Sequence, residues 1–158
     1  MVPYQNPYEY LIDSSALFDL KRDYPIYIFP SLWEKFNGLC KSKIIVAPKE
    51  VLREIKKGND ELVQWADAFD DIFLEPTDEE VGILQKVMKL YPQKILEKYG
   101  TGVWADPLIV SAAKHYNITI IQHETNDPNQ FKIPFIAANF GVKCIKLVGL
   151  FDEQSWRF

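Results

Sequence analysis

The sequence predicts one α/β domain over residues 1–158, a Rossmann-like three-layer sandwich around a central, mainly parallel sheet. Two observations predict this class. Short apolar runs alternate along the chain with longer segments in which apolar residues recur at helical spacing. The runs are rich in β-branched residues and apolar at most positions, as expected of strands buried on both faces of a parallel sheet.

Five of these runs are predicted to be strands because each is short, apolar and bounded by polar or turn-forming residues. The run that begins at Ile72 is expected at an edge of the sheet, because it is short and closed by Pro76. The predicted strands are Tyr8–Asp13, Lys43–Ala47, Ile72–Glu75, Ile118–Ile121 and Lys143–Leu147.

Helices are predicted between the strands from apolar spacing and from start and stop signals. Ser31 is expected to cap the second helix, and Thr77 with Glu80 forms a capping-box pattern. Asp106 is expected to cap a helix that has Pro107 at its first position. The predicted helical ranges are 14–20, 31–40, 49–55, 60–71, 77–90, 106–116 and 133–141, with a helical turn or tail at 151–156 and a helix or loop at 92–102.

The composition is that of an ordinary globular protein with an acidic balance. The chain has 47% hydrophobic and 25% charged residues, a net charge of −4 and a pI of about 5.2. This charge argues against broad electrostatic binding of nucleic acid, although clustered acids that hold Mg²⁺ or Mn²⁺ are compatible with a nuclease. We expect no membrane span, no signal peptide, a cytoplasmic location and reduced thiols at Cys40 and Cys144, which show no C-x-x-C spacing.

Four acids occupy comparable junctions between predicted strands and helices. Asp13 ends the first strand, and Glu54 lies in the helix that follows the second. Asp106 opens a helix, and Glu124 lies just past the strand that follows this helix. Because strand C-termini and helix N-termini meet at one edge of a parallel sheet, we expect these four side chains to converge there.

Converging carboxylates predict a divalent-metal site. Packed carboxylates repel one another and raise their own pKa values unless a cation lies between them. Ligand sets made only of oxygen atoms suit Mg²⁺ or Mn²⁺. Such ions activate water and stabilise charge on a phosphodiester during hydrolysis. The acid set therefore favours metal-dependent hydrolysis of phosphodiester bonds.

Four segments, which occur in the expected order over nearly the whole chain, resemble the motifs of PIN-domain nucleases, with a pattern closest to a toxin-like prokaryotic branch. The third, in which an aspartate opens an alanine-rich helix, is the most specific. In the fourth, Gln122 stands where the family usually has threonine, and Glu124 stands where it usually has aspartate. The segments are Leu11–Leu17, Val46–Ile55, Ala105–Ala113 and Ile120–Glu124.

The resemblance implies a PIN-like fold and a metal-dependent endoribonuclease in which Asp13, Glu54, Asp106 and Glu124 hold Mg²⁺ or Mn²⁺ and carry the catalysis. It also implies an RNA substrate and the role of a toxin restrained by a protein antitoxin, and it leaves open a homodimer. The loop Thr125–Lys132 is longer than usual in the family and contains Asp127, which is an alternative fourth acid.

Other interpretations of these residues remain open at this stage. Asp13 and Asp106 could serve only as helix caps, Ser15 could orient Asp13 or a metal-bound water, and His123 is expected to be a bystander. A non-catalytic PIN-like scaffold that binds RNA or protein is the alternative function. A phosphatase of the haloacid-dehalogenase type is disfavoured, because it needs a second aspartate where this chain has Ser15.

Overall fold

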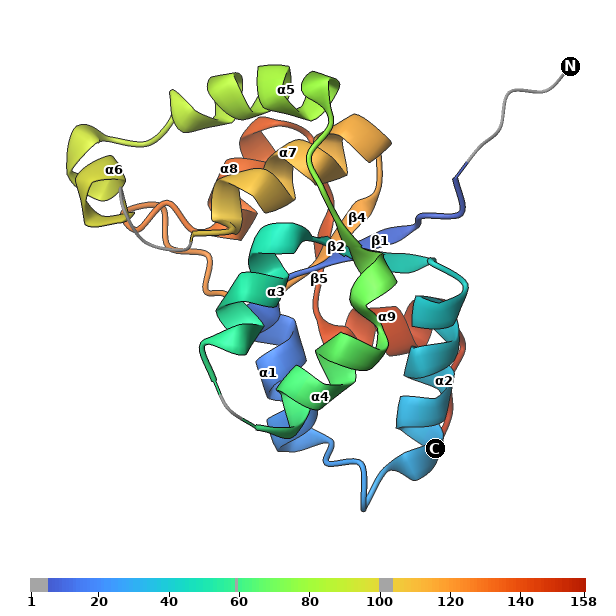
Figure 1. Cartoon of the computed structure of the whole chain (residues 1–158). Coiled ribbons are helices and arrows are strands. Elements are labelled where there is room, and N and C mark those ends of the chain that lie inside the picture. Colours follow the sequence, from blue (N-terminus) through green and yellow to red (C-terminus); the bar gives the residue numbers. More distant parts are fainter. Residues whose placement is uncertain (1–5, 59, 100–103) are drawn as a thin grey trace, which may run out of the picture.

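The computed structural model describes residues 6–58, 60–99 and 104–158 and shows an α/β fold around a five-stranded sheet (Figure 1). The strand order is β3-β2-β1-β4-β5, and every neighbouring pair is parallel. The predicted fold class is therefore confirmed. The strands are β1 Tyr10–Ile12, β2 Ile45–Pro48, β3 Phe73–Leu74, β4 Thr119–Ile121 and β5 Cys144–Ile145.

The order of the strands places β1 at the centre of the sheet. The chain runs from β1 outward to β2 and β3, then returns to the other side of β1 for β4 and β5. The connections after β1 and after β4 therefore lead away in opposite directions. In open α/β sheets, ligands bind in the crevice that such a reversal leaves at the C-terminal ends of the strands.

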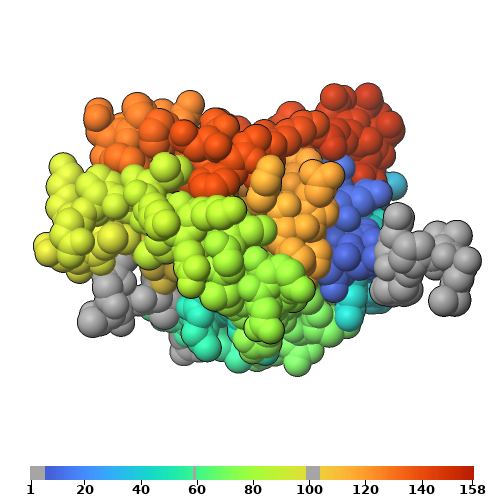
Figure 2. Space-filling view, turned by 90° about the horizontal axis from the view of Figure 1, so that it is seen from above, coloured from blue at the N-terminus to red at the C-terminus, as the bar shows by residue number. Residues whose placement is uncertain are grey.

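Helices cover both faces of the sheet. α5, α7 and α8 lie on one side, and α1, α2, α4 and α9 lie on the other (Figure 1). Figure 2 shows α5 along the outer surface of the first layer, where it packs on α7, with α6 projecting at one end. The helices are α1 Ser14–Asp23, α2 Pro30–Lys41, α3 Lys49–Lys56, α4 Glu61–Ala68, α5 Asp78–Met88, α6 Gln93–Tyr99, α7 Asp106–Tyr116, α8 Ile133–Asn139 and α9 Leu147–Glu153, with a 3-10 turn at Asp70–Ile72.

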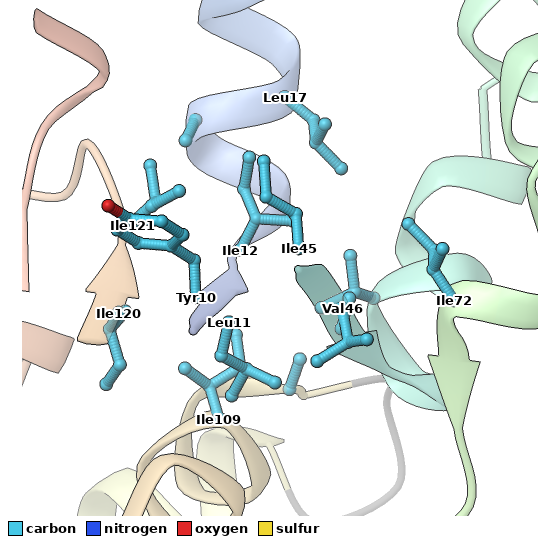
Figure 3. Packing of buried hydrophobic residues seen from close by; sticks show 14 of the residues in the cluster. Tyr10, Leu11, Ile12, Leu17, Ile45, Val46, Ile72, Ile109, Ile120 and Ile121 are labelled. Carbon is cyan, nitrogen blue, oxygen red and sulfur yellow. The ribbon is translucent and has the colours of Figure 1, made fainter. Parts of the chain in front are cut away.

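The core is built on both faces of β1. All three residues of the strand are buried, and successive side chains point to opposite faces. Leu11 points toward Ile109 of α7, whereas Ile12 points toward the layer that holds Leu17 of α1 (Figure 3). The continuous apolar run of the sequence is thus explained by helices on both sides.

Several local predictions are confirmed. Thr77 Oγ1 accepts a hydrogen bond from the backbone N–H of Glu80 at 3.2 Å, so the N-cap bond of the predicted capping box is formed. The strand at Phe73–Leu74 lies at an edge, and both cysteines are free thiols. Of the range 92–102, residues 93–99 form α6, whereas 100–102 lie outside the described residues.

Other boundaries differ from the predictions. Ser31 does not cap α2, which begins one residue earlier at Pro30, because proline suits the first helical position. Asp106 is the first residue of α7 rather than its cap, which is Ala105, so its carboxylate is not used by the helix backbone. The helix predicted over 60–71 ends at Ala68 and continues as the 3-10 turn.

The last predicted strand also differs, because it ends at Ile145 and Leu147 begins α9. The backbone N–H of Leu147 donates to Nε2 of His123 at 3.0 Å. A contact between distant segments therefore overrides the local strand pattern at this point. Among the described residues, no helix combines the length and the apolar character needed to cross a membrane.

Truncating the centre of the core should destabilise the protein strongly. Leu11 is fully buried on the middle strand, so Leu11→Ala should lower the free energy of unfolding by about 2–5 kcal/mol in urea denaturation. Val148→Ala is the control, because the side chain of Val148 is 64% exposed, and its effect should stay within about 0.5 kcal/mol. Equal effects of the two substitutions would contradict the assignment of this core.

Candidate metal centre

Asp13 is placed at the C-terminal edge of the sheet by β1. Its backbone is extended (φ −89°, ψ 156°), and it is the N-cap of α1. Its Oδ2 accepts hydrogen bonds from the hydroxyl of Ser15 at 2.7 Å and the backbone N–H of Ser15 at 3.4 Å. Its Oδ1 is buried and has no hydrogen-bond partner among the residues that the structure describes. Capping therefore uses one oxygen of Asp13 and leaves the other available.

Ser15 connects Asp13 to the end of β4. The same hydroxyl that donates to Asp13 accepts the backbone N–H of His123 at 3.0 Å. Each hydroxyl has one donor and can accept as well, so both bonds are satisfied at once. Ser15 thus orients the carboxylate of Asp13, which was one of the two roles open for it.

The His123 ring joins α1 to α9. Its Nδ1 lies 2.7 Å from Oδ2 of Asp19, and its Nε2 accepts the backbone N–H of Leu147. Because Nε2 is an acceptor, the proton of the neutral ring is on Nδ1 and points to Asp19. The role of Asp19 was missed, since nothing local in the sequence pairs it with a residue that lies 104 positions away.

Glu124 is the fourth acid of this edge, rather than Asp127. The turn after β4 is closed by Oε1 of Gln122, which accepts the backbone N–H of Glu124 at 2.7 Å. The Glu124 carboxylate accepts the backbone N–H of Ile133 at 3.0 Å through Oε2. Asp127 instead caps its own loop by accepting the backbone N–H of Asn129 at 2.9 Å.

Three of the predicted acids meet within one small volume. One carboxylate oxygen from each of Asp13, Asp106 and Glu124 lies within 4.8 Å of the others. Glu54 lies outside this group of three, although the charges of Asp13 and Glu124 still act on its half-buried side chain. One oxygen of Glu54, Oε1, is also buried, and no hydrogen-bond partner for it is found in the described part of the chain.

Burial and mutual repulsion raise the pKa values of these acids. Burial, followed by the charge of Glu124, raises the pKa of Asp13 to about 6. Burial, followed by the charges of Asp13 and Glu124, raises the pKa of Glu54 to about 7. The pKa of Asp106 is raised by burial, by the charges of Glu124 and Asp13, and by a hydrogen bond with Glu124. Each shift disfavours the ionised form of the acid, which a cation between the carboxylates would favour.

This arrangement fits a hard divalent cation. Its possible ligands are all carboxylate oxygens, which suit Mg²⁺ or Mn²⁺. The described residues offer no donor to the buried oxygens of Asp13 and Glu54, and a bound cation would satisfy them. A cation would also remove the repulsion that raises the pKa values. Asp13, Asp106 and Glu124 are the residues that could hold it together, with Glu54 beside them.

The comparison with known families gives a match for nearly the whole chain. The model of a family described as "Domain of unknown function (DUF4411)" matches residues 10–158. No curated protein matches the chain. The matched region begins with the first residue of β1 and includes all four acids. The description of the family assigns no activity.

Without divalent cations, stability should fall as pH rises from about 5 to 8. Asp13 and Glu54 have folded pKa values of about 6 and 7, above the ordinary values of about 4 in an unfolded chain. The folded protein therefore binds more protons, and its free energy of unfolding declines as these acids ionise. Between pH 5 and 8, Asp13 alone should contribute roughly 1–2 kcal/mol to the decline.

Urea denaturation in chelator at several pH values measures this decline. Acids with lowered pKa values, such as Asp60, finish titrating below this window. A free energy of unfolding that rises steadily from pH 5 to 8 in chelator would show that these carboxyl groups are not buried together.

Mn²⁺ should stabilise the protein through the same acids. A cation that binds only the folded state adds about 2.7 kcal/mol at 100 times its Kd, a rise in Tm of roughly 5–10 °C for a chain of this size. Asp13→Asn should abolish the rise in a thermal melt. Asp127→Asn should retain it, because Asp127 lies outside the group. Equal rises in Asp13→Asn and in the unsubstituted protein would place cation binding elsewhere.

Proposed function

The chain belongs to the DUF4411 family, and we propose that it is a PIN-like, metal-dependent endoribonuclease that hydrolyses phosphodiester bonds in RNA. The observation that carries the proposal is the meeting of Asp13, Asp106 and Glu124 within 4.8 Å, with Glu54 beside them. These are the four acids that match the motifs of PIN-domain nucleases, taken in the same order along the chain.

The need of the site for a cation supports the proposal. An acceptor that is buried without a partner costs about 1–3 kcal/mol, and Asp13 and Glu54 each have one such oxygen. A purely structural polar cluster would gain from pairing these oxygens with donors. The raised pKa of Asp106 also supports the proposal, because a bound cation would relieve the repulsion from Glu124 and Asp13 that contributes to it.

A Mg²⁺ or Mn²⁺ ion supplies activation of water and stabilisation of charge on the phosphate when it is bound. The residues of the chain hold and orient the ligands. Ser15 fixes the rotation of the Asp13 carboxylate, and the backbone N–H of Ile133 fixes Oε2 of Glu124. Glu54 adds a fourth carboxyl group beside them, close enough for the charges of Asp13 and Glu124 to act on it.

The biological role that we propose is that of a toxin that cleaves cellular RNA and is restrained by a protein antitoxin. This part of the proposal is supported by the likeness of the four motifs to those of toxin-like PIN proteins. The acidic net charge of −4 is compatible with it, because part of that charge is the acid site that a cation would neutralise.

Removal of one ligand should abolish cleavage out of proportion to any loss of stability. The purified protein should cleave mixed cellular RNA in the presence of Mn²⁺. The rate of cleavage should fall at least about 100-fold in Asp13→Asn, Asp106→Asn or Glu124→Gln. Each substitution keeps the shape of the side chain and removes its charge. Asp127→Asn is the matched control, and its rate should stay within about twofold of the unsubstituted protein.

Chelator provides the second control in this assay. Cleavage that persists in chelator or in Asp13→Asn would point to a contaminating nuclease and would leave the mechanism unsupported. Absence of cleavage by a protein that binds Mn²⁺ through Asp13 would instead favour the non-catalytic scaffold that binds RNA or protein.

A further inference from the structure

The helix that carries Glu54 also carries four cationic side chains, counting its C-cap residue, and the surroundings of the four differ. Three of the four are neutralised by acids of the same chain. Lys49 lies 3.8 Å from Glu75, Lys56 lies 3.6 Å from Asp67, and Arg53 pairs with Glu50 one turn earlier. These three pairs leave little unbalanced positive charge for an external ligand. The fourth cation is Lys57.

Lys57 lies on the same helix as Glu54, and the described residues give it no ion-pair partner. It is the C-cap of α3 and is exposed. It follows Glu54 by three residues, a spacing that places two side chains on the same face of a helix. Its charge reaches Glu54 and opposes the burial and the repulsion that raise the pKa of that acid.

A nuclease site built from carboxylates has an electrostatic difficulty. Its acids repel the phosphates on either side of the bond to be cut, and a bound cation offsets this repulsion mainly at its own position. Cations that the acids of the chain do not already neutralise are the groups that best offset this repulsion at the flanking phosphates. On α3, Lys57 is such a cation, whereas Lys49, Arg53 and Lys56 are not.

We propose that the ammonium group of Lys57 binds a phosphate of the RNA substrate next to the phosphate that is cleaved. This inference rests on the proposed function and assigns a substrate-binding residue to the same site. A lysine at a helix C-terminus also interacts favourably with the helix dipole. That interaction would be shared by its neighbour Lys56, the last residue of α3, which makes Lys56 the matched control.

The test measures binding of a labelled single-stranded RNA oligonucleotide by fluorescence anisotropy, with the full chain carrying Asp13→Asn so that cleavage does not interfere. Kd is measured between ~50 and ~200 mM KCl. Adding Lys57→Gln should weaken binding several-fold at the lower salt concentration. It should also reduce the slope of log Kd against log salt by about 0.7, the value for one phosphate contact to a single strand. Lys57→Arg should restore the slope, and Lys56→Gln should leave it unchanged.

Three results would overturn the inference. The first is an equal effect of Lys57→Gln and Lys56→Gln on the slope. The second is the absence of measurable RNA binding before Lys57 is replaced. The third is a combination of two results for Lys57→Gln: tighter Mn²⁺ binding when Asp13 is intact, and no change in the slope of log Kd for RNA against log salt. That combination would mean that Lys57 only offsets the negative charge of the acids.

Failure of the inference and failure of the proposed function give different results. If the unsubstituted protein cleaves RNA and Lys57→Gln does not change the slope, the inference is wrong and the nuclease function stands. If no RNA is cleaved but the slope depends on Lys57, the inference stands and the catalytic function is wrong.

Discussion

The repulsion among buried carboxyl groups is the constraint on which the rest of the site depends. Two ionised carboxylates separated by the 4.8 Å that bounds the group of Asp13, Asp106 and Glu124 repel by about 3 kcal/mol at an effective dielectric constant of 20. Burial adds a desolvation cost, because only 2% of Asp13 is exposed. A fold does not gather such groups for its own stability. It holds them together because the sheet and helices around them are stable enough to bear this cost.

The neighbouring hydrogen bonds do not relieve this cost, which a bound cation would relieve. Ser15, Gln122 and the backbone of Ile133 fix the acids or the turn that carries one of them. None of these bonds reaches Oδ1 of Asp13 or Oε1 of Glu54. The donors therefore orient the carboxyl groups and still leave inward oxygens for a ligand. The bonds of His123 to Asp19 and Leu147 extend this support to two helices in the layer opposite α7.

Much of this arrangement follows from simple properties of the sequence. Continuous apolar runs predict strands covered on both faces, and the parallel sheet then brings Asp13, Asp106 and Glu124 to one edge. The order of strands was not predictable from periodicity, because pairing depends on contacts between distant segments.

The hydrogen bonds that support the acids could not be predicted from local sequence patterns either. His123 was expected to be a bystander, yet it joins Asp19 to the start of α9. Gln122 looked like a departure from the motif, although its longer side chain closes the turn before Glu124. Both roles depend on side-chain reach and on neighbours that are distant in the sequence, which local patterns do not encode.

The most direct test of the central claim is a crystal structure of the protein grown with Mn²⁺, with anomalous diffraction used to locate the ion. The account predicts an anomalous peak at the C-terminal edge of the sheet, with carboxylate oxygens of Asp13, Asp106 and Glu124 at bonding distance. A well-ordered structure at saturating Mn²⁺ with no peak there, or with its peaks only on other surfaces, would contradict the claim that these acids form a metal site.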